Sequence, residues 1–491
     1  MPIQPLMLPI QTYEHRSKPA STSKIVNCYA EQLPGDAKSP VALSRAPGIK
    51  SWITVGDGPI RGMLRAYGTG YQRTDSGDVN QYAHLWVISG SELYWVHRDG
   101  ISFSAVTQNG FPDLGTPGQI SMSQDANQIA VVNQPDAYHH TTTPGSTATG
   151  QATSATFLAY GGAKLVEFLD NWILYVAPDS ATMFGADIGT VVGVNDPLNF
   201  ITAESSPDNI VSMIADHGQL ILFGEETSEI WQNTGVAGFP FQKTINGVFN
   251  QGCAAINSPA KQDQTVFWLA DDLTVRRLEG LTPVRVSTHG IEQILAGLAD
   301  PSECIGQAYS LNGHLMYSMG FNERTLVFDV TTQTWHERQT YGQSEWNPRY
   351  FANVYDKTVV GDYSSNKIGY FDFDTYDEWS STQLMSWTYQ PVYASGTRAF
   401  HDKLEIIMET GIGLATGQGS DPQIMLEYSD DGGVSYTSLP SKDIGPVGRT
   451  DVRVIWSALG SARQRVYRAS VSDPVKITIT DTILSVRGGR L

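Results

Sequence analysis

The sequence predicts an all-β protein in which a β-propeller is preceded by an extended N-terminal arm and followed by a β-sandwich. Two observations carry this prediction. Short apolar segments bounded by turn residues recur at nearly constant spacing through the middle of the chain. Residues 384–491 then change to longer segments in which apolar and polar residues alternate, as in strands with one buried face.

The repeat is centred on one apolar position per unit. These anchors are Leu85, Ile129, Ile173, Leu220, Val266, Leu315 and Val359, at steps of 44, 44, 47, 46, 49 and 44 residues. A four-stranded propeller blade takes about 40–45 residues, and blades must stack on neighbours in a ring to bury their faces. We therefore predict seven blades and expect anchors such as Leu220 and Leu315 to lie in the core.

The two ends of the repeat are irregular, so six and eight blades stay as alternatives to seven. The first unit contains an insertion at residues 68–80, rich in Gly, Asp, Ser and Thr, and the last lacks an evident fourth strand before Asp377. Between the fifth and sixth units, residues 290–299 place Ile291, Ile294, Leu295 and Leu298 at helical spacing. We expect this helix to pack as an insertion between two blades.

The first 50 residues contain seven prolines. Proline at this density favours extended chain and disfavours helices and central strands. We expect an arm that lies on its own propeller or on a neighbouring subunit. The predicted division is therefore an arm over residues 1–54, a propeller over 55–383 and a sandwich over 384–491.

The net charge of −18 is unevenly distributed. Residues 384–491 are neutral and the first 50 residues carry +3, so the predicted propeller region carries −21. Affinity for nucleic acid comes mainly from Lys and Arg that neutralise phosphates. An acidic region of this kind predicts a surface that DNA passes without tight binding.

Other features narrow the class of protein. Cys28, Cys253 and Cys304 are far apart and show no metal-binding or disulfide pattern, as expected of buried thiols in a reducing cytosol. The N-terminus lacks the pattern of a signal peptide, and no apolar run is long enough to span a membrane. We find no pattern for a zinc protease, a serine hydrolase or a P-loop, and predict neither a catalytic residue, a metal nor a cofactor.

The best-formed short motif lies in the predicted sandwich. Ser429, Asp431, Gly433 and Tyr436 fit the Asp-box pattern S-x-D-x-G-x-[ST]-[WY]. The Asp and Ser side chains can bond backbone amides across a hairpin, and the glycines can adopt positive φ. We interpret the motif as a structural turn that carries no catalysis.

The C-terminal region also holds a group of arginines. We consider Arg463, Arg465, Arg468, Arg487 and Arg490 as an interface to an acidic partner, including the acidic region of an adjacent copy. The alternative is that these side chains simply decorate solvent-facing strand positions.

Several segments resemble one family of phage proteins. They are residues 203–210 (Ala-Glu-Ser-Ser-Pro-Asp-Asn-Ile), 223–235 (Phe-Gly-Glu-Glu-Thr-Ser-Glu-Ile-Trp-Gln-Asn-Thr-Gly), 43–49 (Leu-Ser-Arg-Ala-Pro-Gly-Ile) and 291–294 (Ile-Glu-Gln-Ile). The opening Met-Pro-Ile-Gln and the Asp-Pro-Val-Lys-Ile segment near the end are also similar. The family is that of the packaged-DNA stabilisation proteins, the tail hub or nozzle proteins of short-tailed bacteriophages.

The resemblance implies a non-enzymatic component of the virion tail, made in the host cytoplasm. It implies a hexameric ring beneath the portal and its adaptor protein, a channel for genomic duplex DNA, and a needle or plug with tailspikes or fibres nearby. Two alternatives from other classes stay open, a propeller glycosidase or lyase and a glycan-binding tail module. The Asp box gives slight support to the glycosidase or lyase, although such enzymes usually carry several copies within their blades.

Overall fold

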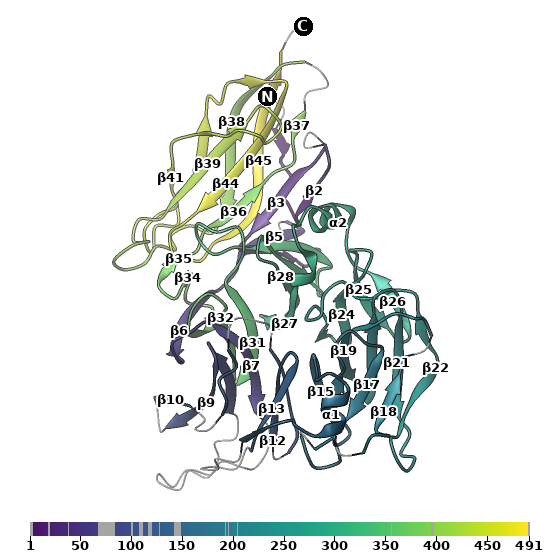
Figure 1. Cartoon of the computed structure of the whole chain (residues 1–491). Helices are drawn as coiled ribbons and strands as arrows, with labels where there is room; N and C mark the ends of the chain where they lie inside the picture. Colours follow the sequence, from purple (N-terminus) through teal and green to yellow (C-terminus); the bar gives the residue numbers. More distant parts are fainter. Residues whose placement is uncertain are drawn as a thin grey trace.

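The structure is a computed structural model of the whole chain. It describes residues 3–489 except 18–19, 38, 67–83, 100–101, 108–110, 116–119, 127, 142–148, 192, 195, 204, 355 and 394–396. The predicted insertion at 68–80 and Arg490 therefore lie outside the described residues. The described part is almost entirely β-structure, with a propeller in the lower half of Figure 1 and a sandwich in the upper half.

Seven successive antiparallel units of four strands make up the propeller in the described residues. The first four units are β7 (Ile60–Ala66), β8 (His84–Ser89), β9 (Glu92–Asp99) and β10 (Ser102–Thr107); β11 (Ser121–Gln124), β12 (Gln128–Asn133), β13 (Asp136–Thr141) and β14 (Thr149–Gln151); β15 (Leu165–Leu169), β16 (Trp172–Val176), β17 (Thr182–Gly185) and β18 (Phe200–Thr202); and β19 (Ile210–Asp216), β20 (Gln219–Gly224), β21 (Ser228–Asn233) and β22 (Phe241–Phe249).

The remaining units follow the same order, but the last takes one strand from the N-terminal segment. They are β23 (Ala260–Gln262), β24 (Thr265–Leu269), β25 (Val275–Glu279) and β26 (Thr282–Arg285); β27 (Ile305–Leu311), β28 (His314–Gly320), β29 (Thr325–Asp329) and β30 (Thr334–Arg338); and β31 (Pro348–Val354), β32 (Lys357–Asp362), β33 (Lys367–Asp372) and β6 (Gly48–Thr54), the last extended by β34 (Asp377–Glu378) and β35 (Ser381–Thr382).

The blades are joined by separate hydrophobic cores, one between each pair of neighbours. The first and second blades share a core around Trp86 and Val131, and the fourth and fifth share one around Phe223 and Trp268. The ring closes where β31 contacts β7 and where residues of the last blade pack against the first. Because each blade buries both faces on its neighbours, no single blade contains a complete core.

All seven predicted anchors lie in the second strand of their units. Six are almost fully buried, including Leu220, but Leu315 is only partly buried. The expectation that Leu315 is a core residue is therefore wrong. At the start of β28 the neighbouring His314 is buried instead and pairs with buried Asp329.

Residues 1–54 do not form a separate arm. The segment is extended, as expected, but its strands are built into both domains: β3 (Thr22–Val26) pairs with β30 and β36, β5 (Val41–Arg45) pairs with β45, and β6 pairs with β33. The expectation that the prolines exclude central strands is wrong, because the strands lie between the prolines.

The sandwich consists of two sheets around one core. One sheet has the order β4-β5-β45-β38-β42, with β1 on β45 and β43 on β38; the other continues β30-β3 into β36-β44-β39-β40, with β2, β37 and β41 at its edges. The strands not yet bounded are β1 (Ile3–Pro5), β2 (Tyr13–Glu14), β4 (Cys28–Gln32), β36 (Met385–Thr388), β37 (Val392–Tyr393), β38 (Ala399–Met408), β39 (Gln423–Ser429), β40 (Thr437–Ser438), β41 (Lys442–Asp443), β42 (Val454–Ser457), β43 (Ser461–Ala462), β44 (Gln464–Val471) and β45 (Thr478–Gly488).

The few helices lie in connections between blades. The predicted helix is α2 (His289–Ala296), between β26 and β27, and its Ile291 and Leu295 are buried in the core between the fifth and sixth blades. The Thr288 side chain caps it by accepting from the amide of Ile291. The others are α1 (Ala155–Ala159) and the short 3₁₀ helix η1 (Pro301–Glu303). Among the described residues, no helix is both long and apolar enough to cross a membrane.

The anchors give a direct test of the blade packing. Leu220 is fully buried between the third and fourth blades, so Leu220→Ala should lower the free energy of unfolding by roughly 2–5 kcal/mol. Leu315→Ala, a matched change at a partly buried anchor, should cost clearly less. Urea unfolding followed by tryptophan fluorescence measures both, and equal losses would contradict the register described here.

Three buried histidines are held in the neutral form. Burial lowers the pKa of His140 and of His401 to about 4, and that of His336 to about 3. The His314–Asp329 pair acts in the opposite direction, because hydrogen bonding to Asp329 raises the pKa of His314. Of these four histidines, three have a lowered pKa and one has a raised pKa, so the net dependence of stability on pH follows the lowered values.

These pKa shifts predict acid sensitivity. An unfolded histidine has a pKa of about 6.5, so between that pH and the lowered folded pKa the unfolded state binds more protons. Stability present at neutral pH should be lost as pH falls, by up to about 1.4 kcal/mol per pH unit for each histidine. Thermal melts across this range should show a smaller decline for His336→Gln than for the wild type. His289→Gln, at a side chain that is 82% exposed, should leave the decline unchanged.

Candidate functional site at the domain junction

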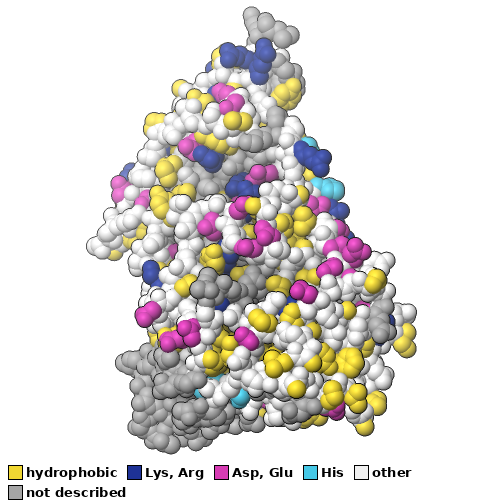
Figure 2. All heavy atoms as spheres, in the orientation of Figure 1, with side chains coloured by type: hydrophobic (Ala, Val, Ile, Leu, Met, Phe, Trp, Pro, Cys, Tyr) yellow, Lys and Arg dark blue, Asp and Glu magenta, His cyan; other side chains and the backbone are white. Residues whose placement is uncertain are grey.

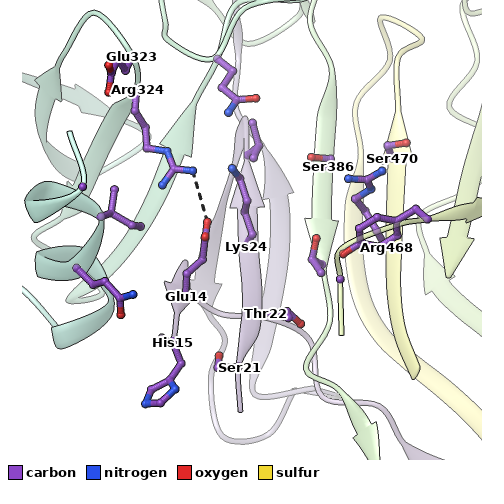
Figure 3. A pocket seen from close by; sticks show the side chains of 18 of the residues that line it. Glu14, His15, Ser21, Thr22, Lys24, Glu323, Arg324, Ser386, Arg468 and Ser470 are labelled. Carbon is purple, nitrogen blue, oxygen red and sulfur yellow. Dashed lines mark ion pairs between the residues drawn. The ribbon is translucent and has the colours of Figure 1, made fainter. Parts of the chain in front are cut away.

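A cavity lies where the propeller meets the sandwich. It has a volume of about 860 Å³ and is walled by β2, β3, α2, the β28–β29 turn, β36, β44 and the Asp-box turn. Figure 3 shows its side chains coming from three directions, with Glu14 and Arg324 pointing toward each other. Its walls therefore come from the N-terminal segment, the propeller and the sandwich together.

Strand β3 is the physical link between the two domains. It runs parallel to β30 of the sixth blade, with Val26 opposite Glu337, and antiparallel to β36 of the sandwich. At its end, Asn27 adopts positive φ, and its Nδ2 donates to the carbonyls of Gln339 and Leu384 at 2.9 Å each. A propeller blade and a sandwich sheet thereby become one continuous hydrogen-bonded sheet.

A charge network reinforces this link. The Glu337 carboxylate is fully buried and lies 3.1 Å from Lys24 Nζ and 3.4 Å from Arg324 Nε. Arg324 also reaches Glu14 of β2 at 3.6 Å (Figure 3). Because a buried carboxylate is costly without partners, the network favours the arrangement in which β2 and β3 are docked.

Arg45 forms a second link on the other sheet of the sandwich. Its side chain is almost fully buried, and Nη1 donates to the carbonyls of Asp473 and Val475 in the sandwich. Nη2 donates to the carbonyls of Tyr376 and Gln383, which lie between the domains. Burial lowers the pKa of Arg45 to about 10. One guanidinium thus joins the N-terminal segment, the interdomain connection and the sandwich.

The Asp-box residues form a closed turn in the wall of the cavity. The Asp431 carboxylate accepts from the amides of Val434 and Ser435 at 3.0 Å, and Ser429 Oγ accepts from the Gly433 amide at 2.7 Å. These hydrogen bonds hold the pKa of Asp431 well below its usual value. Gly433 has a φ of 89°, which favours glycine. Each oxygen of the carboxylate is engaged in shaping the loop.

Tyr436 connects this turn to the sandwich sheet. The Arg468 guanidinium of β44 lies 3.9 Å from the centre of its ring, and both residues line the cavity. Arg468 also pairs with Glu427 at 2.6 Å. The Asp-box turn is therefore held against the junction.

The structure separates the predicted arginine interface into different environments. Arg465 is only 2% exposed and pairs with Asp430 at 2.6 Å, so its charge is satisfied within the chain and it does not belong to an exposed interface. Arg468 faces the junction. Arg463 and Arg487 are exposed at the far tip of the sandwich, although Arg487 pairs with Asp402 at 2.6 Å.

The tip contains a further arginine that the sequence pattern did not single out. Register places Phe400 of β38 opposite both Arg487 and Ser461, and the Gly489 amide bonds the Arg398 carbonyl at 2.6 Å. Arg398, Arg463 and Arg487 are thus neighbours, and we call them the basic tip. Among the described residues, no ion pair engages Arg398 or Arg463. In Figure 2, Lys and Arg side chains gather at this upper end.

Sequence reasoning missed the junction residues Asn27, Arg45 and Glu337. Their roles depend on pairing between segments more than 300 residues apart, and no local pattern marks such partners. In the described part of the chain, no group of three His, Cys, Asp or Glu side chains is arranged to hold a metal ion.

Comparison with protein families identifies both domains. The family model described as "Bacteriophage P22 Gp10, beta-propeller" matches residues 21–376. A second model, described as Bacteriophage P22 Gp10, beta-sandwich, matches residues 386–487. The predicted order of a propeller followed by a sandwich is confirmed, and so is the resemblance to the phage stabilisation family.

Solved structures show only distant similarity. The computationally designed Ika8 protein is 11% identical, with a TM-score of 0.37, covering 66% of this chain and 99% of its own. BamB from Moraxella catarrhalis is 12% identical, with a TM-score of 0.38, covering 71% of this chain and 98% of its own. No curated protein matches the sequence.

Arg45 provides a test of the junction. Arg45→Met keeps an unbranched side chain but removes the guanidinium and leaves buried carbonyls without donors. It should lower the free energy of unfolding by about 3 kcal/mol or more, measured by urea unfolding. Arg449→Met, at a side chain that is 60% exposed, should stay within about 0.5 kcal/mol of the wild type. A similarly small effect of Arg45→Met would show that the junction does not depend on this residue.

Proposed function

We propose a role at the centre of the phage tail for this chain, which belongs to the P22 Gp10 family. Members of the family are phage structural proteins associated with stabilising packaged DNA. In our proposal, six copies form a hub or nozzle ring below the portal and its adaptor protein. The ring seals the packaged DNA and then forms the channel through which it is ejected. Family membership is the observation that carries this proposal.

The charge distribution supports a channel that does not grip DNA. Residues 51–383 carry a balance of −21, and Figure 2 shows acidic side chains over the middle and lower parts of this face. A negative wall repels phosphates, so genomic duplex can slide along it. The protein acts mechanically in this proposal, without catalysis, in the virion tail after assembly from the host cytoplasm.

The basic tip supports contact with an acidic partner. Arg398 and Arg463 are exposed and form no ion pair with any described residue, and the aromatic rings of Tyr393 and Phe400 nearby are 66% and 45% exposed. Exposed arginine beside aromatic side chains is typical of protein interfaces. The propeller of an adjacent copy and the adaptor are the partners we propose for this surface, with the needle or plug and the tailspikes or fibres elsewhere on the ring.

The glycosidase and glycan-binding alternatives gain nothing from the structure. The Asp box that suggested the glycosidase lies in the sandwich, and its carboxylate is bonded within its own turn. These hydrogen bonds support the interpretation of the motif as a structural turn. We therefore propose no second function.

The sealing role predicts leakage. Particles assembled without this protein should fill with DNA and then lose it, so nuclease-sensitive DNA should rise with time. Supplying the wild-type protein should stop the loss, because the ring closes the portal. Full retention of DNA without the protein would refute the sealing role.

A matched pair of variants tests whether the basic tip is needed for sealing when the protein is present. The double variant Arg398→Glu, Arg463→Glu reverses the charge of the basic tip and should fail to stop the leakage. Lys367→Glu makes one such change at an exposed position of the propeller and should seal normally. Normal sealing by the double variant would remove the basic tip from the interface and leave the sealing role intact.

A further inference from the structure

A second cavity lies on the axis of the propeller. It has a volume of about 550 Å³, and its lining includes residues at or next to the start of the innermost strands of five blades, β7, β11, β15, β27 and β31. Because these strands surround the axis, the cavity is the mouth of the central channel of a single propeller. It is separate from the domain junction, with which it shares no lining residue.

Three cationic side chains from three different blades converge on this mouth. They are Arg61 of β7, Lys164 just before β15 and Arg349 of β31. The one carboxylate in the described lining is Glu303, whose Oε2 accepts from the Asn322 side chain. A local excess of positive charge thus sits inside a propeller whose overall balance is strongly negative.

Each of the two arginines donates a hydrogen bond to a backbone carbonyl. Arg61 Nη1 donates to the carbonyl of Gly90 at 2.8 Å, and Arg349 Nη2 donates to the carbonyl of Phe321 at 2.7 Å. The Arg349 guanidinium also stacks 3.8 Å from the centre of the Tyr363 ring. These contacts orient each guanidinium at the cavity. Asp113 acts on Arg61 at longer range, and Glu345 acts on Arg349.

Lys164 is the least compensated of the three. Within the described residues, no hydrogen bond or ion pair reaches its ammonium, although Asp179 and Glu225 act on it at longer range. Burial lowers the pKa of Lys164, and it also lowers those of Arg61 and Arg349. All three cations are partly desolvated at a shared site, which is costly unless a negative group approaches them.

We propose that the axial cavity binds a small polyvalent oxyanion, held through its carboxylate or phosphate oxygens by Lys164, Arg61 and Arg349. The volume lies within the roughly 300–1,000 Å³ of small-molecule sites. Ammonium and guanidinium groups on several sides suit a ligand with more than one negative group. The site is distinct from the channel proposed for duplex DNA, which runs between subunits.

Calorimetric titration of the full chain in a chloride buffer tests this site. The probes are citrate for carboxylates and pyrophosphate for phosphates, with glycerol as a neutral comparison. At least one anion should bind at one site per chain, and glycerol should not. Lys164→Met should weaken binding about tenfold or more, because it removes a hydrogen bond to a charged group. Lys367→Met, at an exposed lysine of the last blade, should bind as the wild type does.

Two further measurements ensure that the result does not depend on how the variant folds. Circular dichroism checks the fold of Lys164→Met. In the wild type, added sodium chloride should weaken binding of the anion, since the attraction is Coulombic. Absence of saturable binding by either anion, binding insensitive to salt, or unchanged affinity in folded Lys164→Met would each overturn the proposal. None of these results bears on sealing of DNA, which is measured on particles.

Discussion

The structure depends on strands that the first 54 residues contribute to the sheets of both domains. Strand β6 completes the last blade, β5 pairs with the last strand of the sandwich, and β3 joins a blade to a sandwich sheet. Backbone hydrogen bonds are obligatory for buried strands, so each of these places would be left with open edges if the segment were absent. The propeller ring and the orientation of the sandwich are therefore set by the same short stretch of sequence.

Buried charge makes the junction specific. Glu337, Arg45 and their partners are removed from water, and a buried charge is tolerated only in the geometry that satisfies it. An apolar contact would allow the sandwich to slide or tilt on the propeller. Carbonyl acceptors on two sides of Arg45, by contrast, fix one angle.

Local patterns predicted the blades because the strands of a blade pair mostly with their neighbours in sequence. The sandwich strands were predicted from their alternating pattern alone, since most of them pair with distant segments. The anchor spacing placed the second strand of each unit correctly, and helical spacing located α2. The sequence pattern failed where the position of a residue depends on pairing with a distant segment or on an ion pair. Strand β33 pairs with β6, more than 300 residues away, and the ion pair of buried Arg465 is with Asp430 in the turn after β39. Likewise, the cations at the axial cavity are far apart in sequence and meet only when the ring closes.

The pairing of β5 with β45 has a consequence for synthesis of the protein. Strand β5 pairs with its neighbour β4, but its other edge and strand β1 are paired by β45, residues 478–488. Until β45 has been made, that edge of β5 stays exposed, a condition that favours aggregation. The sandwich sheet that contains β5 is therefore completed only after all strands of the propeller have been made. A chain interrupted before residue 478 leaves β1 and one edge of β5 without their partner strand.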